Sequence, residues 1–290
     1  MKKTRPSSLT EMEERSKPLF SREGFKAGLA LKLRPTDVVI TPYGKSGTTW
    51  TQQIVHTLRT RGDMDFDDIS RVVPWIETSV GLGLDLDAEQ RGHPRAFKSH
   101  LSWDMVPKGG RYINVVRDPG DVIVSLFKFQ EGWFLEPGTV SIDEFAHASF
   151  FKSRDYYKHL RSWWPRRNDD DVLFLAYEKM LKNPTETIQR IAAFIGIELD
   201  AELLAITEEH ASLPFMLKYK DRFDDAMLRK LSEKLADLPE GSDSAKVREG
   251  KTGSSTVLSE EIHILLDATW QEEITSNLGF GDYPALIEAL

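Results

Sequence analysis

The segment Gly44-Lys-Ser-Gly-Thr-Thr-Trp50 brings together one positive charge, three hydroxyl groups and two glycines in seven residues. Glycine lets the backbone approach a ligand closely, and free N–H groups at the start of a helix attract anions. Lys45 adds a full positive charge at the same place. A turn followed by an ordinary capped helix would explain each of these features alone, but not their combination. The segment therefore predicts a site for a phosphate or a similar anion.

A second candidate for chemistry is the pair Lys98 and His100, in Pro94-Arg-Ala-Phe-Lys-Ser-His-Leu101. The segment is typical of a short strand that ends in polar residues, and open α/β sheets bind ligands at the carboxyl ends of their strands. An imidazole at that position can act as a general base. A surface or capping histidine is the usual alternative, and the chain has seven histidines.

Arg117 and Ser125 form a third candidate site, in Val116-Arg-Asp-Pro-Gly-Asp-Val-Ile-Val-Ser125. The guanidinium group is a planar fork of donors, and together with a hydroxyl group it suits a phosphate. Two other interpretations are open. Arg117 could pair with Asp118 or Asp121, and Asp118 could be the acid of a Walker-B motif.

Strands followed directly by helices must position these residues. The run 38–40 is β-branched and typical of a strand buried on both faces, and Pro42 ends it. A helix is expected to begin near Thr48, and Pro119 suits the first turn of another helix after the strand 112–116. Further expected elements are a strand over 171–178 and helices over 142–164, 184–195, 200–210 and 259–276.

Composition limits the class of protein. A chain of 290 residues with 40% hydrophobic and 29% charged residues is typical of a single globular domain, here residues 1–290, with loop insertions. The net charge of −8 argues against a general nucleic-acid binder. The chain has no cysteine, which excludes disulfides and thiolate metal sites, and no paired-histidine helix of zinc spacing, so no metal is expected.

Two polar segments are expected to be at least partly mobile. Residues 1–35 read as an N-terminal extension that is partly mobile and has no visible chemistry, and 218–250 has the composition of a mobile lid. The N-terminus has basic residues but no apolar stretch of a secretory signal, and no apolar run approaches membrane-spanning length. A cytoplasmic location is therefore expected.

Tyr43-Gly-Lys-Ser-Gly-Thr-Thr-Trp50 closely resembles the 5′-phosphosulfate loop of the sulfotransferases that use 3′-phosphoadenosine 5′-phosphosulfate (PAPS), usually Tyr-Pro-Lys-Ser-Gly-Thr-Thr-Trp. Gly44 replaces the proline of that family. The segment is not a standard P-loop, because Gly44-Lys45-Ser46 comes before Gly47. The resemblance implies a P-loop-like, three-layer α/β/α fold with a mainly parallel central sheet.

Other segments resemble the same family in the same order along the chain. Val-Arg-Asp-Pro-x-Asp-x-x-x-Ser, ending at Ser125, matches its 3′-phosphate motif. Lys98-Ser-His100 resembles its Lys-Thr-His, whose histidine is the catalytic base. Tyr177-Glu-Lys-Met180 resembles the family segment whose tyrosine reaches the adenosine. In Arg248-Glu-Gly250 a glutamate replaces the lysine of the family's phosphate loop.

The resemblance implies a role for each matching residue, with PAPS as cosubstrate and adenosine 3′,5′-bisphosphate (PAP) as its product. His100 is the implied general base, working near its usual pKa, while Lys45 and Lys98 neutralise charge on the reacting groups. The acceptor is expected to contact Trp75, Phe129 and Trp133. The nucleotide is expected to contact Lys45, Ser46, Gly47, Thr48, Thr49, Trp50, Arg117, Ser125, Tyr177, Ser212, Met216, Arg248, Glu249 and Gly250.

The chain is thus identified as a member of the PAPS-dependent sulfotransferases, acting on a hydroxyl group of a small, partly hydrophobic phenol or alcohol. A glycolipid or carbohydrate acceptor is the alternative within the class. A P-loop nucleotide kinase and a non-catalytic nucleotide-binding protein are the alternatives from other classes. Thr256-Val257-x-x-x-Glu261 partly resembles the family's dimer motif, with Thr252 at its lysine position. A monomer or weak homodimer is expected, with no nucleic-acid partner and no membrane span.

Overall fold

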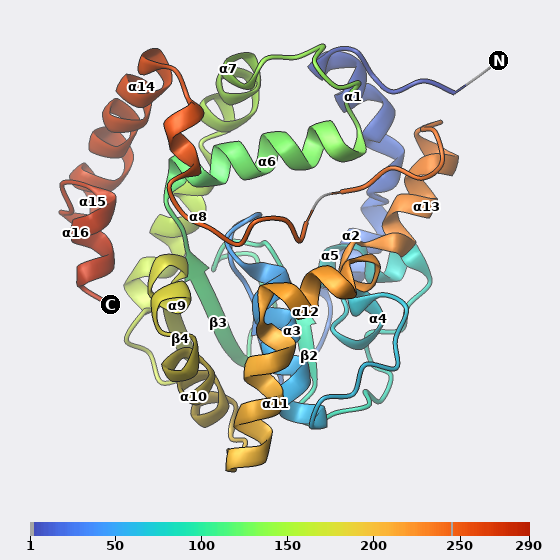
Figure 1. Ribbon diagram of the computed structural model, residues 1–290, viewed down its shortest axis with the longest axis vertical. Coiled ribbons are helices and arrows are strands. Elements are labelled where there is room, and N and C mark those ends of the chain that lie inside the picture. Colours follow the sequence, from blue (N-terminus) through green and yellow to red (C-terminus); the bar gives the residue numbers. More distant parts are fainter. Residues whose placement is uncertain (1–2, 245) are drawn as a thin grey trace.

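Four parallel strands form the sheet at the centre of the protein (Figure 1). The computed structural model describes residues 3–244 and 246–290. In the pairing of the strands, Ile40 lies opposite Lys98 on one side and opposite Ile113 on the other. Because the strands are parallel, their carboxyl ends meet at one edge of the sheet, where open α/β folds bind ligands. The sheet has the order β2-β1-β3-β4 and consists of β1 (Val38–Ile40), β2 (Ala96–Lys98), β3 (Arg111–Val116) and β4 (Val172–Ala176).

One face of the sheet is covered by α3 (Thr48–Thr60) and α10 (Pro184–Ile195), while α11 (Ala201–Ala211) packs on α3 (Figure 1). The apolar side chains of α3 recur at helical spacing, so the helix buries a continuous stripe against the strands. The helices predicted over 184–195 and 200–210 are confirmed. The core on this face includes Val38, Ile40, Ile54, Val55, Leu58, Ile113 and Ile191.

The second face is covered by α6 (Pro119–Trp133), α8 (Asp155–Trp163) and α14 (Glu260–Trp270). Successive strand residues point to opposite faces, which is why Val39 packs on this side while its two neighbours in β1 pack on the other. The predicted three-layer α/β/α fold with a parallel central sheet is therefore confirmed. The core on this face includes Val39, Phe97, Tyr112, Val122, Ile123, Tyr156, Trp163 and Ile262.

The N-terminal residues fold against a segment late in the sequence. They form α2 (Arg22–Leu29) and α1 (Leu9–Ser16), of which α1 lies near α13 (Ala226–Leu235) (Figure 1). Arg15 donates from Nε to the carbonyl of Ala236 at 2.9 Å and from Nη2 to that of Asp237 at 2.8 Å. The remaining α-helices are α4 (Ile69–Val72), α5 (Ile76–Ser79), α7 (Ile142–Phe145), α9 (Tyr177–Lys182), α12 (Leu213–Lys218), α15 (Ser276–Leu278) and α16 (Tyr283–Glu288).

Two predictions of secondary structure are wrong. The strand predicted over 171–178 ends at Ala176, and Tyr177 begins α9. The single helix expected over 142–164 consists of α7, a π-helical stretch and α8, and the break falls at Arg154. Arg154 has a left-handed φ of 53°, and its guanidinium is held by Glu273 at 2.8 Å. The span 218–250, predicted from its composition to be a mobile lid, contains α13, and its mobility stays a prediction. Its polar composition concealed an amphipathic helix, whose Leu228 packs in one cluster with Trp133.

Candidate active site

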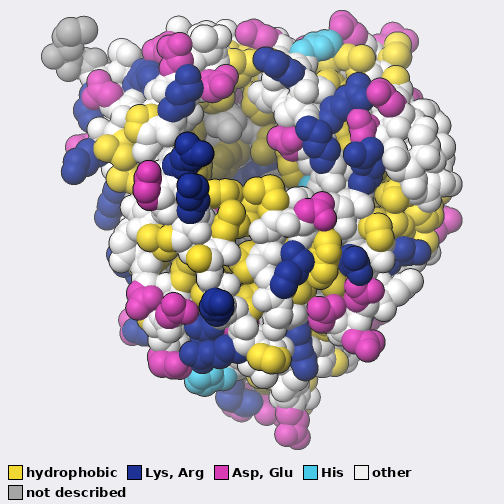
Figure 2. Space-filling view, turned by 180° about the vertical axis from the view of Figure 1, so that it is seen from behind, with side chains coloured by type: hydrophobic (Ala, Val, Ile, Leu, Met, Phe, Trp, Pro, Cys, Tyr) yellow, Lys and Arg dark blue, Asp and Glu magenta, His cyan; other side chains and the backbone are white. Residues whose placement is uncertain are grey.

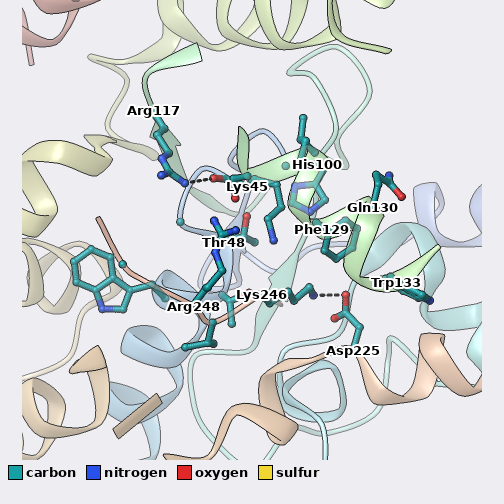
Figure 3. Close-up of a pocket in the computed structure, with 18 of the residues that line it drawn as sticks. Lys45, Thr48, His100, Arg117, Phe129, Gln130, Trp133, Asp225, Lys246 and Arg248 are labelled. Carbon is teal, nitrogen blue, oxygen red and sulfur yellow. Dashed lines mark hydrogen bonds and ion pairs between the residues drawn. The ribbon is translucent and has the colours of Figure 1, made fainter. Parts of the chain in front are cut away.

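A pocket of about 400 Å³ lies at the carboxyl ends of the strands. It is bounded by the β1–α3 loop, residues that follow β2, β3 and β4, one side of α6, and residues 246–251 with 254. Figure 3 shows Lys45, His100 and Arg117 around this space, with Phe129 and Trp133 on one side of it. The face opposite to that of Figure 1 is hollowed in its upper half, with hydrophobic side chains inside the hollow and basic side chains on its rim (Figure 2).

The β1–α3 loop forms a cradle at the N-terminus of α3. Gly47 caps the helix with a φ of 90°, and a Cβ there would lie 2.9 Å from Cδ2 of Tyr177. Lys45 also has a positive φ, of 65°. The hydroxyl of Thr48 is buried and has no hydrogen-bond partner within residues 3–244 and 246–290. An anion at the helix N-terminus would satisfy this hydroxyl, so the loop fits a phosphate or sulfate group.

Two lysines border the pocket, of which Lys98 is buried and Lys45 is half-buried. The ammonium of Lys45 lies 4.5 Å from the ring centroid of Phe129, and that of Lys98 lies 3.8 Å from the ring centroid of Trp75. Burial lowers the pKa of Lys45 well below its usual range, and neighbouring cations add to this effect. Burial also lowers the pKa of Lys98, to about 8, against the opposing effect of Asp225. Cations that have lost this much hydration interact strongly with an anionic ligand.

His100 is held in one orientation by the backbone around it. Its Nδ1 atom lies 2.7 Å from the carbonyl oxygen of Pro42, and its backbone N–H donates to Oε1 of Glu77 at 2.6 Å. The Trp75 ring packs edge-on against the imidazole, with 5.3 Å between the ring centroids. Burial, followed by the positive charge of Lys98, lowers the pKa of His100 well below its usual value. The expectation that His100 works near its usual pKa is therefore wrong.

Arg117 joins two loops at the edge of the pocket. It donates from Nη1 to the carbonyl of Lys45 at 3.0 Å and from Nη2 to that of Lys251 at 3.1 Å. Oδ2 of Asp121 lies 3.6 Å from Nη2 of Arg117, so the ion pair between these two residues, considered above as an alternative, is present. Arg117 Nε is nevertheless buried without a hydrogen-bond partner in the described part of the chain. Ser125 and Arg248 also line the pocket, as their motifs predicted.

An aromatic surface lies next to these arginines. The Trp50 indole donates to the carbonyl of Ala211 at 2.8 Å and packs edge-on against Tyr177, with 5.9 Å between ring centroids. The guanidinium of Arg117 lies 4.5 Å from the Tyr177 ring centroid. The other predicted site residues that line the pocket are Gly47, Thr48, Thr49, Trp75, Phe129, Trp133, Met216, Glu249 and Gly250.

Two predicted nucleotide contacts do not line the pocket. Ser46 is buried within the loop, and Ser212 caps α12, where its hydroxyl accepts from the N–H of Phe215 at 3.4 Å. Glu249 does line the pocket, but its carboxylate pairs with Lys251 at 2.5 Å. A local motif gives the sequence position of a side chain, whereas a cap or an ion pair decides its direction.

Sequence reasoning missed several lining residues. Asp225 precedes α13, and Lys246 comes two residues before Arg248; the two form a buried ion pair (Figure 3). No motif marks them, and the one available signal was the proximity of Lys246 to Arg248. The N-terminal residues, expected to have no chemistry, also contribute to the wall. The remaining missed residues include Met12, Ser16, Leu19, Phe20, Gln130, Phe134 and Leu228.

Within the described ranges, no three His, Cys, Asp or Glu side chains are grouped so as to hold a metal ion. Among the same residues, no helix combines the length and apolar character needed to cross a membrane. The expected cytoplasmic location and the expected oligomeric state stay predictions.

Comparison with known proteins points to one family. A family model described as the sulfotransferase domain matches residues 35–254. Sulfotransferase 1B1 of Canis lupus familiaris is 33% identical over 198 residues, covering 63% of this chain and 67% of that protein. The amine sulfotransferase of Oryctolagus cuniculus is 31% identical over 184 residues, covering 59% and 60%. The crystal structure of mouse sulfotransferase SULT7A1 complexed with PAP has a TM-score of 0.68 at 22% identity, covering 94% of this chain and 95% of that chain.

The three-layer fold and the pocket of buried cations define a P-loop-like protein with a site for an anionic ligand. Because the family model covers most of its length, the chain belongs to the sulfotransferase family. It is a PAPS-dependent sulfotransferase, as the sequence motifs predicted. The chain spans between 60% and 67% of the length of the two relatives described above, so its own acceptor is a matter for proposal.

Proposed function

We propose that this enzyme transfers the sulfonate group of PAPS to a hydroxyl group of a small, partly hydrophobic phenol or alcohol, with His100 as the general base. One observation carries the proposal. A histidine whose Nδ1 is engaged by a backbone carbonyl shares a pocket with aromatic walls with the buried Lys98 and the half-buried Lys45. The same pocket thereby offers a proton acceptor, a cationic end and an apolar end, which are the parts that such a transfer needs.

Unsatisfied polar groups support a nucleotide at the cationic end. The Thr48 hydroxyl, Arg117 Nε and Arg248 Nε are buried and lack partners in the described part of the chain. Phosphate oxygens would accept from all of them, and leaving such donors unpaired is costly. Lys45 and Thr48 would hold the 5′ end of the nucleotide, and Arg117, Ser125 and Arg248 its 3′-phosphate. When bound, PAPS supplies the sulfonate group, and PAP remains after the transfer.

At the reacting end, His100 takes the proton of the acceptor hydroxyl on Nε2. The Nδ1–H group stays bonded to the carbonyl of Pro42, so the ring keeps its orientation as it becomes charged. Lys45 and Lys98 neutralise the negative charge on the reacting groups. Their low hydration strengthens this effect, because electrostatic interactions gain strength where water is excluded.

The walls of the acceptor end favour an apolar molecule. Trp75, Phe129, Trp133 and Phe134 line it, together with the N-terminal Phe20. Such a lining suits the ring of a phenol or the carbon skeleton of an alcohol, whereas a sugar requires several convergent polar groups. A glycolipid or carbohydrate acceptor is therefore the less favoured alternative. The name of the rabbit relative adds an amine as a class to be tested.

The test uses purified enzyme, PAPS labelled on the sulfonate group, and a panel containing a phenol, an aliphatic alcohol, an arylamine and a monosaccharide. We expect transfer to the phenol or the alcohol that is unaffected by EDTA. Transfer confined to the amine or the sugar would refute the proposed acceptor class. Phosphoryl transfer from ATP with a strict Mg²⁺ requirement would favour a kinase. Binding of PAP without transfer to any molecule would favour a non-catalytic nucleotide-binding protein.

A further inference from the structure

Asp225 lies at the centre of a buried cluster of charges that borders the pocket. Its Oδ1 atom is 4.0 Å from the ammonium of Lys98, and its Oδ2 atom pairs with the ammonium of Lys246 (Figure 3). The side chains of Lys98, Asp225 and Lys246 are only 3%, 4% and 8% exposed. One carboxylate is thus shared by two ammonium groups where little water reaches them. In such a place ion pairing is strong, and each uncompensated charge is costly.

Contacts from other elements fix the position of Asp225. The hydroxyl of Ser70, on α4, donates to Oδ1 at 3.4 Å. Next to it, the carboxylate of Asp68 accepts from the backbone N–H of Met227 at 2.9 Å and so ties the first turn of α13 to α4. Asp225 itself has a left-handed φ of 46°, which a non-glycine residue keeps only where its surroundings impose it. The carboxylate is therefore held in place before any ligand binds.

The position of the Lys98 ammonium depends on the carboxylate of Asp225. Within residues 3–244 and 246–290, Asp225 is its one ion-pair partner, and the Trp75 ring lies on its ammonium at 3.8 Å. A lysine side chain has four rotatable bonds and loses entropy when it is fixed. A single anion within reach therefore decides where the ammonium stays.

We propose that Asp225 is a positioning residue for sulfonate transfer: it holds the Lys98 ammonium at the reacting end of the pocket and keeps it charged, while Lys246 competes for the same carboxylate. The inference rests on the proposed function, which gives Lys98 the role of neutralising charge on the reacting groups. Asp225 acts through Lys98 and Lys246, its partners in the cluster.

The charges around Lys98 determine whether each substitution raises or lowers the pKa of Lys98. Burial lowers the pKa of Lys98, to about 8, while Asp225 raises it and Lys246 lowers it. Removing the carboxylate therefore lowers the pKa of Lys98 further, and removing Lys246 raises it. The other charged or titratable groups that face Lys98, unchanged in the variants below, are Lys45, Asp68, Glu77 and His100.

The experiment measures the pKa of Lys98 by NMR of the full chain labelled on its lysine side chains, with Lys98→Arg to assign the signal. Asp225→Asn should lower this pKa by about one pH unit or more, and Lys246→Met should raise it. Asp224→Asn is the matched control. Asp224 is also buried and is the adjacent residue, but it pairs with Arg229 at 2.8 Å. This control should leave the pKa of Lys98 unchanged.

A second readout links this pKa to the reaction. The alkaline limb of kcat/KM for PAPS reports the free enzyme, and the acceptor identified by the panel serves for the assay. The limb should move to lower pH in Asp225→Asn and to higher pH in Lys246→Met. Near-UV circular dichroism and thermal unfolding identify any variant that does not fold. Because the two substitutions act in opposite directions, Lys246→Met decides the question if Asp225→Asn does not fold.

Opposite shifts in both readouts support the proposal. An unchanged pKa of Lys98 in a folded variant, or a shift in the other direction, overturns it. If the pKa of Lys98 moves but the alkaline limb does not, the link to transfer is refuted, and the fault lies in the proposed role of Lys98. Failure of the acceptor panel would instead refute the proposed function, and the NMR result would still show whether Asp225 controls Lys98.

Discussion

The Nδ1 atom of His100 lies 2.7 Å from the carbonyl oxygen of Pro42. A carbonyl oxygen can only accept a hydrogen bond, so Nδ1 carries the proton, and Nε2 of the neutral ring keeps its lone pair. The backbone N–H of His100 is fixed as well, by the carboxylate of Glu77 at 2.6 Å. The ring therefore has one nitrogen available to receive a proton, and the folded chain determines which nitrogen it is.

His100→Ala should lower kcat by roughly 10²–10⁴-fold and leave the affinity for PAP nearly unchanged, because a general base acts on the acceptor. Turnover with labelled PAPS and calorimetry with PAP measure the two quantities. His147→Ala is a suitable control, since that histidine is exposed, pairs with Glu261 at 3.1 Å and does not line the pocket. Near-normal turnover of His100→Ala would remove His100 from the mechanism.

The pH profile should show that His100 is neutral throughout the neutral range. Burial and the charge of Lys98 lower its pKa well below the usual value, so the ring stays unprotonated as the pH falls through about 6.5. We expect kcat/KM for PAPS, which reports the free enzyme, to stay constant through that range and to fall only in more acidic solution. A loss of half the activity near pH 6.5 that depends on His100 would contradict this prediction.

Much of the proposed nucleotide end of the site was predictable, because Lys45 and Arg117 each follow a strand in a short local motif. Lys45 lies after β1 and Arg117 directly after β3, and these strands are neighbours in a parallel sheet. Their side chains had to come to the same edge, and Arg117 Nη1 lies 3.0 Å from the Lys45 carbonyl. The position of each of these residues after a strand can be recognised from its sequence neighbours, so this part of the site can be predicted without knowing any long-range contact.

Trp75, Phe129 and Trp133 of the proposed acceptor end were predicted from local segments, whereas the rest of its wall comes from segments far apart in the chain. Leu19, Trp133 and Leu228 belong to one apolar cluster, although they come from the N-terminus, α6 and α13. Asp225 and Lys246 lie on opposite sides of α13 in the sequence, and they meet near Lys98 at the carboxyl end of β2. The helices α1 and α13 are polar on average, and their composition does not show which of their side chains a distant element will bury.

Gly47→Ala should lower both the free energy of unfolding and the affinity for PAP. A Cβ at Gly47 would lie 2.9 Å from the Tyr177 ring, and its φ of 90° is unfavourable for alanine. The left-handed conformation alone costs about 1–2 kcal/mol, which chemical denaturation would detect as a lower free energy of unfolding. Calorimetry should show weaker binding of PAP.

Gly44→Ala provides the control in the same loop. The nearest atom to a Cβ at Gly44 is Cδ2 of Leu126 at 3.9 Å, an ordinary contact, and Gly44 has no positive φ. This variant should keep nearly the stability and PAP affinity of the wild type. Equal behaviour of the two alanine variants would show that the loop does not need the backbone conformation of Gly47.

Arg117 should determine the preference for a nucleotide with a phosphate on the ribose 3′-oxygen. Its Nε is buried without a partner in the described part of the chain, and Ser125 and Arg248 line the same pocket. A charge-assisted hydrogen bond is worth about 1.5–3 kcal/mol, and about 1.4 kcal/mol already gives a tenfold ratio. PAP should therefore bind to the wild type at least about tenfold more tightly than adenosine 5′-phosphate.

Arg117→Ala should erase most of that ratio, with a smaller effect on adenosine 5′-phosphate itself. Arg117 also holds the carbonyls of Lys45 and Lys251, so part of any loss comes from loosened loops and affects both nucleotides alike. Arg117→Lys keeps a positive charge but lacks the planar fork, and it should retain an intermediate preference. Calorimetry of both nucleotides with the three proteins separates these effects, because the ratio of affinities cancels the shared contribution of the loops. Equal affinities in the wild type would contradict the 3′-phosphate site.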